Sequence, residues 1–266
     1  NLLLILPWRL QMSKNNNKSV IKPQERFTEI SSGDMTRIAG VSKETCNSQN
    51  IHLAIATIPP GKSSSTHFHI NCESAIFVLS GEGIFIAGEK LDKHNTIKTG
   101  DFIYVPPNAP HKPVNTSNKN SLILMVSRNQ PTEIVEEISN ENDLNQIPNP
   151  TNCSVINSDE LNNSITNYGS VKHGVSKQTS EIKNISLTEL NINKNETILS
   201  QKHSEHETGI YVSEGEGLFI SNDNLDSHQN IKAGDFIYIQ KNLNHKISNT
   251  NSENNMKLII ARNSKI

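Results

Sequence analysis

Short apolar segments recur along the chain, separated by Gly, Pro and Asn residues. They are rich in β-branched and aromatic side chains, which favour strands over helices. The clearest of them span residues 51–58, 75–79, 84–87, 101–105 and 122–126. Many short strands at this spacing predict an all-β sandwich or barrel.

Helical signals are weak by comparison. Residues 132–138 (TEIVEEI) carry acidic side chains early, as the first turn of a helix prefers, and residues 158–161 resemble a single capped turn. We therefore expect little helix, confined to these two places.

The strand pattern occurs twice. Gly40-Val41-Ser42-Lys43 returns 134 residues later at Gly174, and the GDFIY that begins at Gly100 returns at Gly234. Between 73–111 and 207–245, 20 of 39 aligned positions are identical without a gap. A repeat of this length predicts two copies of one domain. We place the first at 19–130 and the second at 154–266, with a polar, proline-broken linker at 131–153.

The first 18 residues precede this pattern. Residues 1–7 are apolar but far fewer than the roughly 20 that a membrane helix needs, and residues 13–18 are polar. We expect residues 1–18 to form a disordered N-terminal extension.

Candidate chemistry lies between Gly61 and Asn115. His67 and His69 are two residues apart, so in a strand both imidazoles leave the same face. Glu73 follows, and His111 comes after a short proline-containing turn. Three imidazoles and a carboxylate suit a first-row divalent metal.

The spacing of these residues resembles the cupin superfamily, whose motifs read G-x5-H-x-H-x3/4-E-x6-G and G-x5-P-x-G-x2-H-x3-N. The positions that match are Gly61, His67, His69 and Glu73 in the first motif and Gly100, Pro106, His111 and Asn115 in the second. Asn108 stands where Gly is usual. The resemblance implies two tandem jelly-roll β-barrels, a bicupin, with a divalent transition metal (Fe, Mn, Ni, Zn or Cu) on His67, His69, Glu73 and His111.

One departure concerns Glu73. Seven residues rather than six separate it from Gly81. Because facing alternates along a strand, the extra residue turns Glu73 away from the metal unless a bulge absorbs it.

The repeat defines a second candidate metal site. Adding 134 maps the first set onto Gln201, His203, Glu207 and His245. Gln201 replaces an imidazole, and an amide oxygen is the weaker donor for transition metals. Glu205 and His206 have no equivalents in the first copy and offer substitutes if the loop is displaced.

Composition adds limits on the partners. The net charge is −2, which gives no reason to expect nucleic acid or an anionic membrane as a partner. Three scattered cysteines argue against a disulfide framework and for a reducing compartment, so we expect a cytoplasmic protein. Barrels of this kind leave sheet edges that a second copy covers, and we expect a homodimer.

Two functions fit these features. One is a metalloenzyme acting on a small oxygenated substrate (a carboxylate, an enol or a sugar derivative), a dioxygenase, decarboxylase or isomerase with the first copy active. The wording around the motifs is similar to small bacterial cupins described as sugar-epimerase-like or phosphomannose-isomerase-like. The other is a non-catalytic metal- or sugar-binding module. The sequence identifies no general base, and the catalytic residues stay unassigned.

Overall fold

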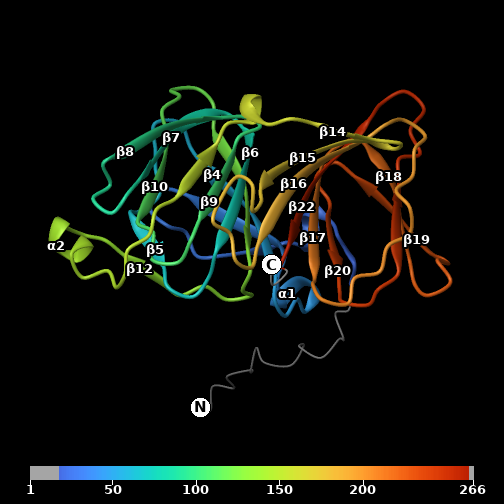
Figure 1. Cartoon of the computed structure of the whole chain (residues 1–266), viewed down its shortest axis with the longest axis horizontal. Coiled ribbons are helices and arrows are strands. Elements are labelled where there is room, and N and C mark those ends of the chain that lie inside the picture. The colour runs from blue at the N-terminus through green and yellow to red at the C-terminus, as the bar shows by residue number, and fades with distance from the viewer. Residues whose placement is uncertain (1–17, 264–266) are drawn as a thin grey trace, which may run out of the picture.

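The structure, a computed structural model, describes residues 18–263 and is built almost entirely of antiparallel strands (Figure 1). Apart from Lys18, the predicted N-terminal extension lies outside the described residues. The five predicted strands are all present, with ends shifted by two residues or fewer. The all-β prediction of two tandem barrels is confirmed.

Each copy folds into one large and one small sheet. The large sheet of the first copy runs β13 (Ser154–Ile156), β9 (Phe102–Val105), β6 (Ser74–Ser80), β11 (Leu122–Arg128), β4 (His52–Ile58), β3 (Thr36–Val41), β2 (Phe27–Thr28). Its small sheet runs β12 (Val135–Glu137), β5 (His67–His69), β10 (His111–Asn115), β7 (Glu82–Ala87), β8 (Lys93–Lys98).

The second copy repeats this plan. Its large sheet runs β1 (Val20–Ile21), β20 (Phe236–Ile239), β17 (Thr208–Glu214), β22 (Met256–Arg262), β16 (Ser186–Ile192), β15 (Gly169–Val175), β14 (Ser164–Thr166). Its small sheet runs β19 (Ser227–Lys232), β18 (Glu216–Ser221), β21 (His245–Ser248).

The two copies exchange one strand each. β1 begins the first copy in sequence but pairs with β20 of the second, and β13 begins the second copy but pairs with β9 of the first. The large sheets therefore lie in the middle of the molecule, with the small sheets on its outer flanks (Figure 1).

A shared core joins the two large sheets. One apolar cluster draws buried side chains from both copies, whereas two further clusters fill the individual barrels. At its centre a Cβ on Gly40 would lie 2.0 Å from the Phe236 ring, and one on Gly174 equally close to Phe102. The glycine of each repeated Gly-Val-Ser-Lys thus leaves room for the phenylalanine of the other copy's GDFIY, where a larger residue would overlap the ring.

Helices are short and few among the described residues: α1 (Lys43–Cys46), α2 (Glu141–Leu144) and the 3-10 turns η1 (Pro23–Glu25) and η2 (Ser158–Glu160). The turn expected at 158–161 is η2. The helical interpretation of 132–138 is wrong, because Val135 and Glu137 pair with His69 and His67 and make this segment the edge strand β12.

Two other features bear on the expectations from composition. Cys46, Cys72 and Cys153 are all free thiols, as their number and spacing predict. Between residues 18 and 263 there is no helix of the length and apolarity needed to cross a membrane.

Candidate metal centre

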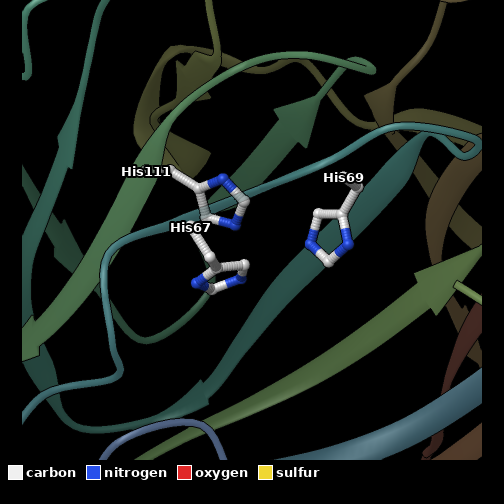
Figure 2. A group of neighbouring side chains, drawn as sticks. All are labelled: His67, His69 and His111. Atoms are coloured by element: carbon white, nitrogen blue, oxygen red, sulfur yellow. The ribbon is translucent and has the colours of Figure 1, made fainter. Parts of the chain in front are cut away.

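His67, His69 and His111 come together inside the first barrel. His67 and His69 lie on β5, and His111 lies directly opposite His67 across the β5–β10 ladder. The ring centroids are 4.3 Å apart for His67 and His111, 5.1 Å for His67 and His69, and 5.3 Å for His69 and His111. Figure 2 shows the three rings gathered around one common space. All three side chains are buried.

The turn before β10 places His111 in this group. Asn108 has a φ of 61°, the left-handed conformation that favours Gly and that Asn tolerates best among other residues. Its backbone N–H donates to the carbonyl of His69 at 2.7 Å. Asparagine therefore fills the glycine position of the motif without altering the turn. In the second copy Asn242 repeats the conformation, with a φ of 63°, and its N–H donates to His203.

Backbone carbonyls fix the orientation of two of the rings. Nδ1 of His67 lies 2.9 Å from the Ser65 carbonyl oxygen, and Nδ1 of His111 lies 2.9 Å from that of Ala109. Because a carbonyl oxygen only accepts, each Nδ1 carries the proton and each Nε2 keeps a free lone pair. This tautomer is the one that a metal ligated through Nε2 requires.

The donor set fits a divalent transition metal. One nitrogen from each ring can be chosen so that all three lie within 4.8 Å of one another. A metal about 2.1 Å from each nitrogen needs separations of about 3–4 Å, which small rotations of the rings supply. His69, His67 and His111 would hold the ion, and the chemistry of imidazole donors suits Fe, Mn, Ni, Zn or Cu.

Burial keeps these imidazoles neutral. It lowers the pKa of His67 to about 4, with His69 adding to the shift, and it lowers the pKa of His111 well below the usual range. The pKa of His69 is also lowered by burial, against the opposing effect of Glu133. Metal binding requires the unprotonated ring, so protons compete weakly with a metal here at neutral pH.

The structure places Glu73 outside this group. Its carboxylate accepts hydrogen bonds from the Tyr104 hydroxyl at 2.8 Å and from the backbone N–H groups of Lys183 and Asn184 at 2.9 and 2.6 Å. Glu73 thus faces the second copy. The β6–β11 register does shift, between Ser80 and Val78 at the far end of the strand, but this irregularity does not turn Glu73 toward the histidines.

A different carboxylate reaches the histidines. Oε2 of Glu133 lies 3.1 Å from Nδ1 of His69 and 2.9 Å from the Arg128 guanidinium, and its other oxygen pairs with Arg37. Burial raises the pKa of Glu133, but the two arginines and His69 outweigh it and hold that pKa well below its usual range. The carboxylate is therefore charged, and it faces the ring nitrogen of His69 that points away from His67 and His111 (Figure 2).

Sequence reasoning missed Glu133 because no fixed spacing marks it. The residue lies in the segment assigned to the linker, four residues beyond the repeated Arg128-Asn129. It reaches the site only because β12 turns back to pair with β5, Val135 opposite His69. The segment 132–138 (TEIVEEI) has no apolar–polar alternation that would mark it as a strand, so the sequence held no clear signal for this edge.

The second predicted set keeps part of this arrangement. His203 and His245 have ring centroids 5.3 Å apart, the same separation as His69 and His111, and His206 stacks on His203 at 4.5 Å. Gln201 forms an isolated backbone bridge with His245. Among residues 18–263, a triad with metal-binding geometry is found only at His67, His69 and His111.

Glu207 mirrors Glu73. Its carboxylate accepts from the Asn50 backbone N–H at 2.9 Å and lies 3.3 Å from the Ser48 hydroxyl, both in the first copy. The motif carboxylates of both copies thus serve the interface between the barrels.

The sequence profile of the cupin domain matches twice, at residues 54–127 and 188–261, which together make up more than half of the chain. The chain is a cupin. The two matches make it a bicupin, and the resemblance drawn from the motifs is confirmed.

One curated relative and several solved structures are similar to this bicupin. An uncharacterised protein of Methanocaldococcus jannaschii is 36% identical over 89 residues, 32% of this chain and 68% of that protein. The oxalate decarboxylase of Lactobacillus farciminis, in a formate complex, superposes with a TM-score of 0.75 at 15% identity, over 94% of this chain and 87% of that one. The Bacillus subtilis oxalate decarboxylase gives 0.73 at 13% identity, over 94% and 77%. At these identities the structural likeness shows the fold alone.

Proposed function

We propose that this bicupin is a metal-dependent enzyme acting on a small oxygenated substrate, with the first barrel as its active site. The observation that carries the proposal is the triad of His67, His69 and His111, in which backbone carbonyls hold two Nδ1 protons and leave Nε2 free. Three protein ligands leave coordination positions for a substrate, as catalytic metal sites do and closed structural sites do not.

The proposed substrate class is a small carboxylate, an enol or a sugar derivative, and the reaction a decarboxylation, dioxygenation or isomerisation. A bound metal would supply Lewis acidity toward a substrate oxygen. The histidines would hold the ion, and the charged Glu133 would orient His69 through Nδ1. The oxalate decarboxylases of similar fold, of which the Bacillus subtilis protein has Mn(II) centres, support the carboxylate as the first substrate to test.

The experiment is a turnover screen on metal-loaded protein. Oxalate, other small oxo and hydroxy acids and phosphorylated sugars are supplied with and without dioxygen, and products are followed by NMR and mass spectrometry. The matched variant is His111→Ala, and Glu82→Gln, an exposed change on β7, serves as control. Turnover that His111→Ala abolishes and Glu82→Gln retains supports the proposal. Turnover that survives in His111→Ala places the chemistry elsewhere.

The burial of the triad favours a second candidate function, a non-catalytic metal-binding module. The three histidines are only 3–4% exposed, which leaves a substrate a narrow route to the metal. The same screen separates the two functions. A ligand that shifts the spectrum of a Co²⁺-loaded protein and is recovered unchanged identifies the module.

We also propose a homodimer in which the free sheet edges take part. β2 and β14 end the two large sheets, and exposed apolar side chains lie on or beside them, Phe27 and Ile165 among them. Light scattering at micromolar concentration tests this directly, and a monomeric mass contradicts it.

A further inference from the structure

A cavity of about 360 Å³ opens inside the second barrel. Apolar and polar side chains share its walls. Leu190, Ile198 and Ile260 are among the apolar ones, and Leu199 at the lining is 72% exposed. Gln201 and His245, the counterparts of two metal-binding histidines, also line it. Its volume lies within the range of small-molecule pockets, which combine apolar walls with a few polar groups.

The polar groups of this cavity are positive or neutral. Arg262 and Lys246 line it, together with hydroxyl and imidazole side chains, and the lining contains no Asp or Glu. Within residues 18–263, Arg262 takes part in no ion pair, and its buried Nε has no hydrogen-bond partner. The buried hydroxyl of Thr208, in the same lining, is also without a partner.

The first copy differs in the ion pair and not at Nε. Among the described residues the Nε of Arg128 is also without a hydrogen-bond partner, but its guanidinium is paired with a carboxylate. Arg128 occupies the same place on β11 that Arg262 occupies on β22, and Glu133 pairs with it at 2.9 Å. Across the ladder Arg128 lies opposite His52, whereas Arg262 lies opposite Ser186. The small hydroxyl side chain leaves more room beside the guanidinium.

A nearby strand of the same sheet also carries an arginine in the first copy and an apolar residue in the second. Arg37 on β3 lies opposite Ala56, and the matching position on β15, opposite Leu190, is Val171. Where the first copy has a network of charged side chains, the second therefore has a cavity with Arg262 in its wall. Arg262 is only partly buried. A partly buried cation without a counter-charge still carries a desolvation cost, and an anion that enters the cavity offsets it.

We propose that the second barrel is a metal-independent binding site for an organic carboxylate with an aliphatic tail. The carboxylate accepts from Arg262 and the Thr208 hydroxyl, and the tail packs on the leucine and isoleucine side chains toward Leu199. A guanidinium matches a carboxylate with two parallel hydrogen bonds, and the apolar walls reject inorganic anions. This proposal is independent of catalysis in the first barrel.

The test is calorimetric titration of the metal-loaded full chain with hexanoate, 1-hexanol and phosphate. We expect one hexanoate per chain, with 1-hexanol and phosphate each at least tenfold weaker. This comparison uses only the wild-type chain, so it stands whether or not a variant folds. Equal affinity for hexanol, or tighter binding of phosphate, overturns the proposal.

Three variants locate the site. Arg262→Gln should weaken hexanoate binding at least tenfold and Thr208→Val a few fold. His67→Ala/His111→Ala should leave hexanoate binding unchanged. Retention of full affinity in a folded Arg262→Gln protein, or its loss in the double histidine variant, shows that hexanoate binds elsewhere.

Discussion

The two barrels share their contact surface and differ in their interiors. At the contact, Gly40 packs against Phe236, and the equivalent Gly174 packs against Phe102. Glu73 accepts hydrogen bonds from the second copy, and Glu207 accepts them from the first. Inside, the first barrel holds three histidines beside a charged carboxylate, whereas the second holds a cavity and an arginine for which residues 18–263 supply no ion pair. The contact constrains both copies at once, because the glycine of each copy packs against the phenylalanine of the other. Separate apolar clusters fill the two interiors, so the packing of one does not fix the side chains of the other.

The largest expected effect is a difference in metal content between the two barrels. We predict about one tightly held metal per chain, because in the described part of the chain three imidazoles converge only in the first copy. His67→Ala/His111→Ala should lose it, whereas Gln201→His should strengthen the weaker second site. Elemental analysis after dialysis against a chelator measures both. Two equally retained metals in the wild type contradict the comparison.

The second prediction concerns Glu133. Glu133→Gln removes the charge that faces Nδ1 of His69, and loss of such a partner typically weakens metal binding about 10–100-fold. Chelator competition gives the affinity, and circular dichroism checks the fold. Glu136→Gln, an exposed change on the same strand β12, is the matched control and should bind as the wild type does. Equal affinities for the two variants would remove Glu133 from the site.

The third prediction breaks the shared contact. Gly174→Ala should lower the free energy of unfolding by about 1–3 kcal/mol, because its Cβ overlaps the Phe102 ring. Gly40→Ala should cost a similar amount through Phe236. Phe102→Leu added to Gly174→Ala should recover part of the loss, whereas Phe236→Leu should not. Denaturant titration measures all four proteins, and equal rescue by both leucine variants would contradict the pairing.

The sequence predicts the parts of this molecule that depend on local period and on the repeat. Strand alternation gives the sheets, the 134-residue offset gives two domains, and the two-residue spacing puts His67 and His69 on one face of β5. What it misses depends on the path of the chain in space. Glu133 reaches His69 through an edge strand, and the direction of Glu73 is set by donors 110 residues away. No periodicity along one strand contains that information.

The last prediction concerns the motif carboxylates. If Glu73 serves the contact, Glu73→Gln should leave the metal content unchanged and lower the free energy of unfolding by about 2 kcal/mol. The reason is that an amide replaces a charged acceptor for three donors, among them the N–H groups of Lys183 and Asn184. Glu207→Gln should behave alike, because Glu207 accepts from the first copy in the same way.

The control for this prediction is another pair of equivalent glutamates. Glu82 and Glu216 occupy matching exposed positions on β7 and β18, so their Gln variants should stay within about 0.5 kcal/mol of the wild type. Denaturant titration and metal analysis on the four variants decide between the two roles. Loss of metal in Glu73→Gln but not in Glu207→Gln would show that Glu73 is a metal ligand and that the two carboxylates have different roles. Equal destabilisation with full metal retention places both motif carboxylates at the contact that the two copies share.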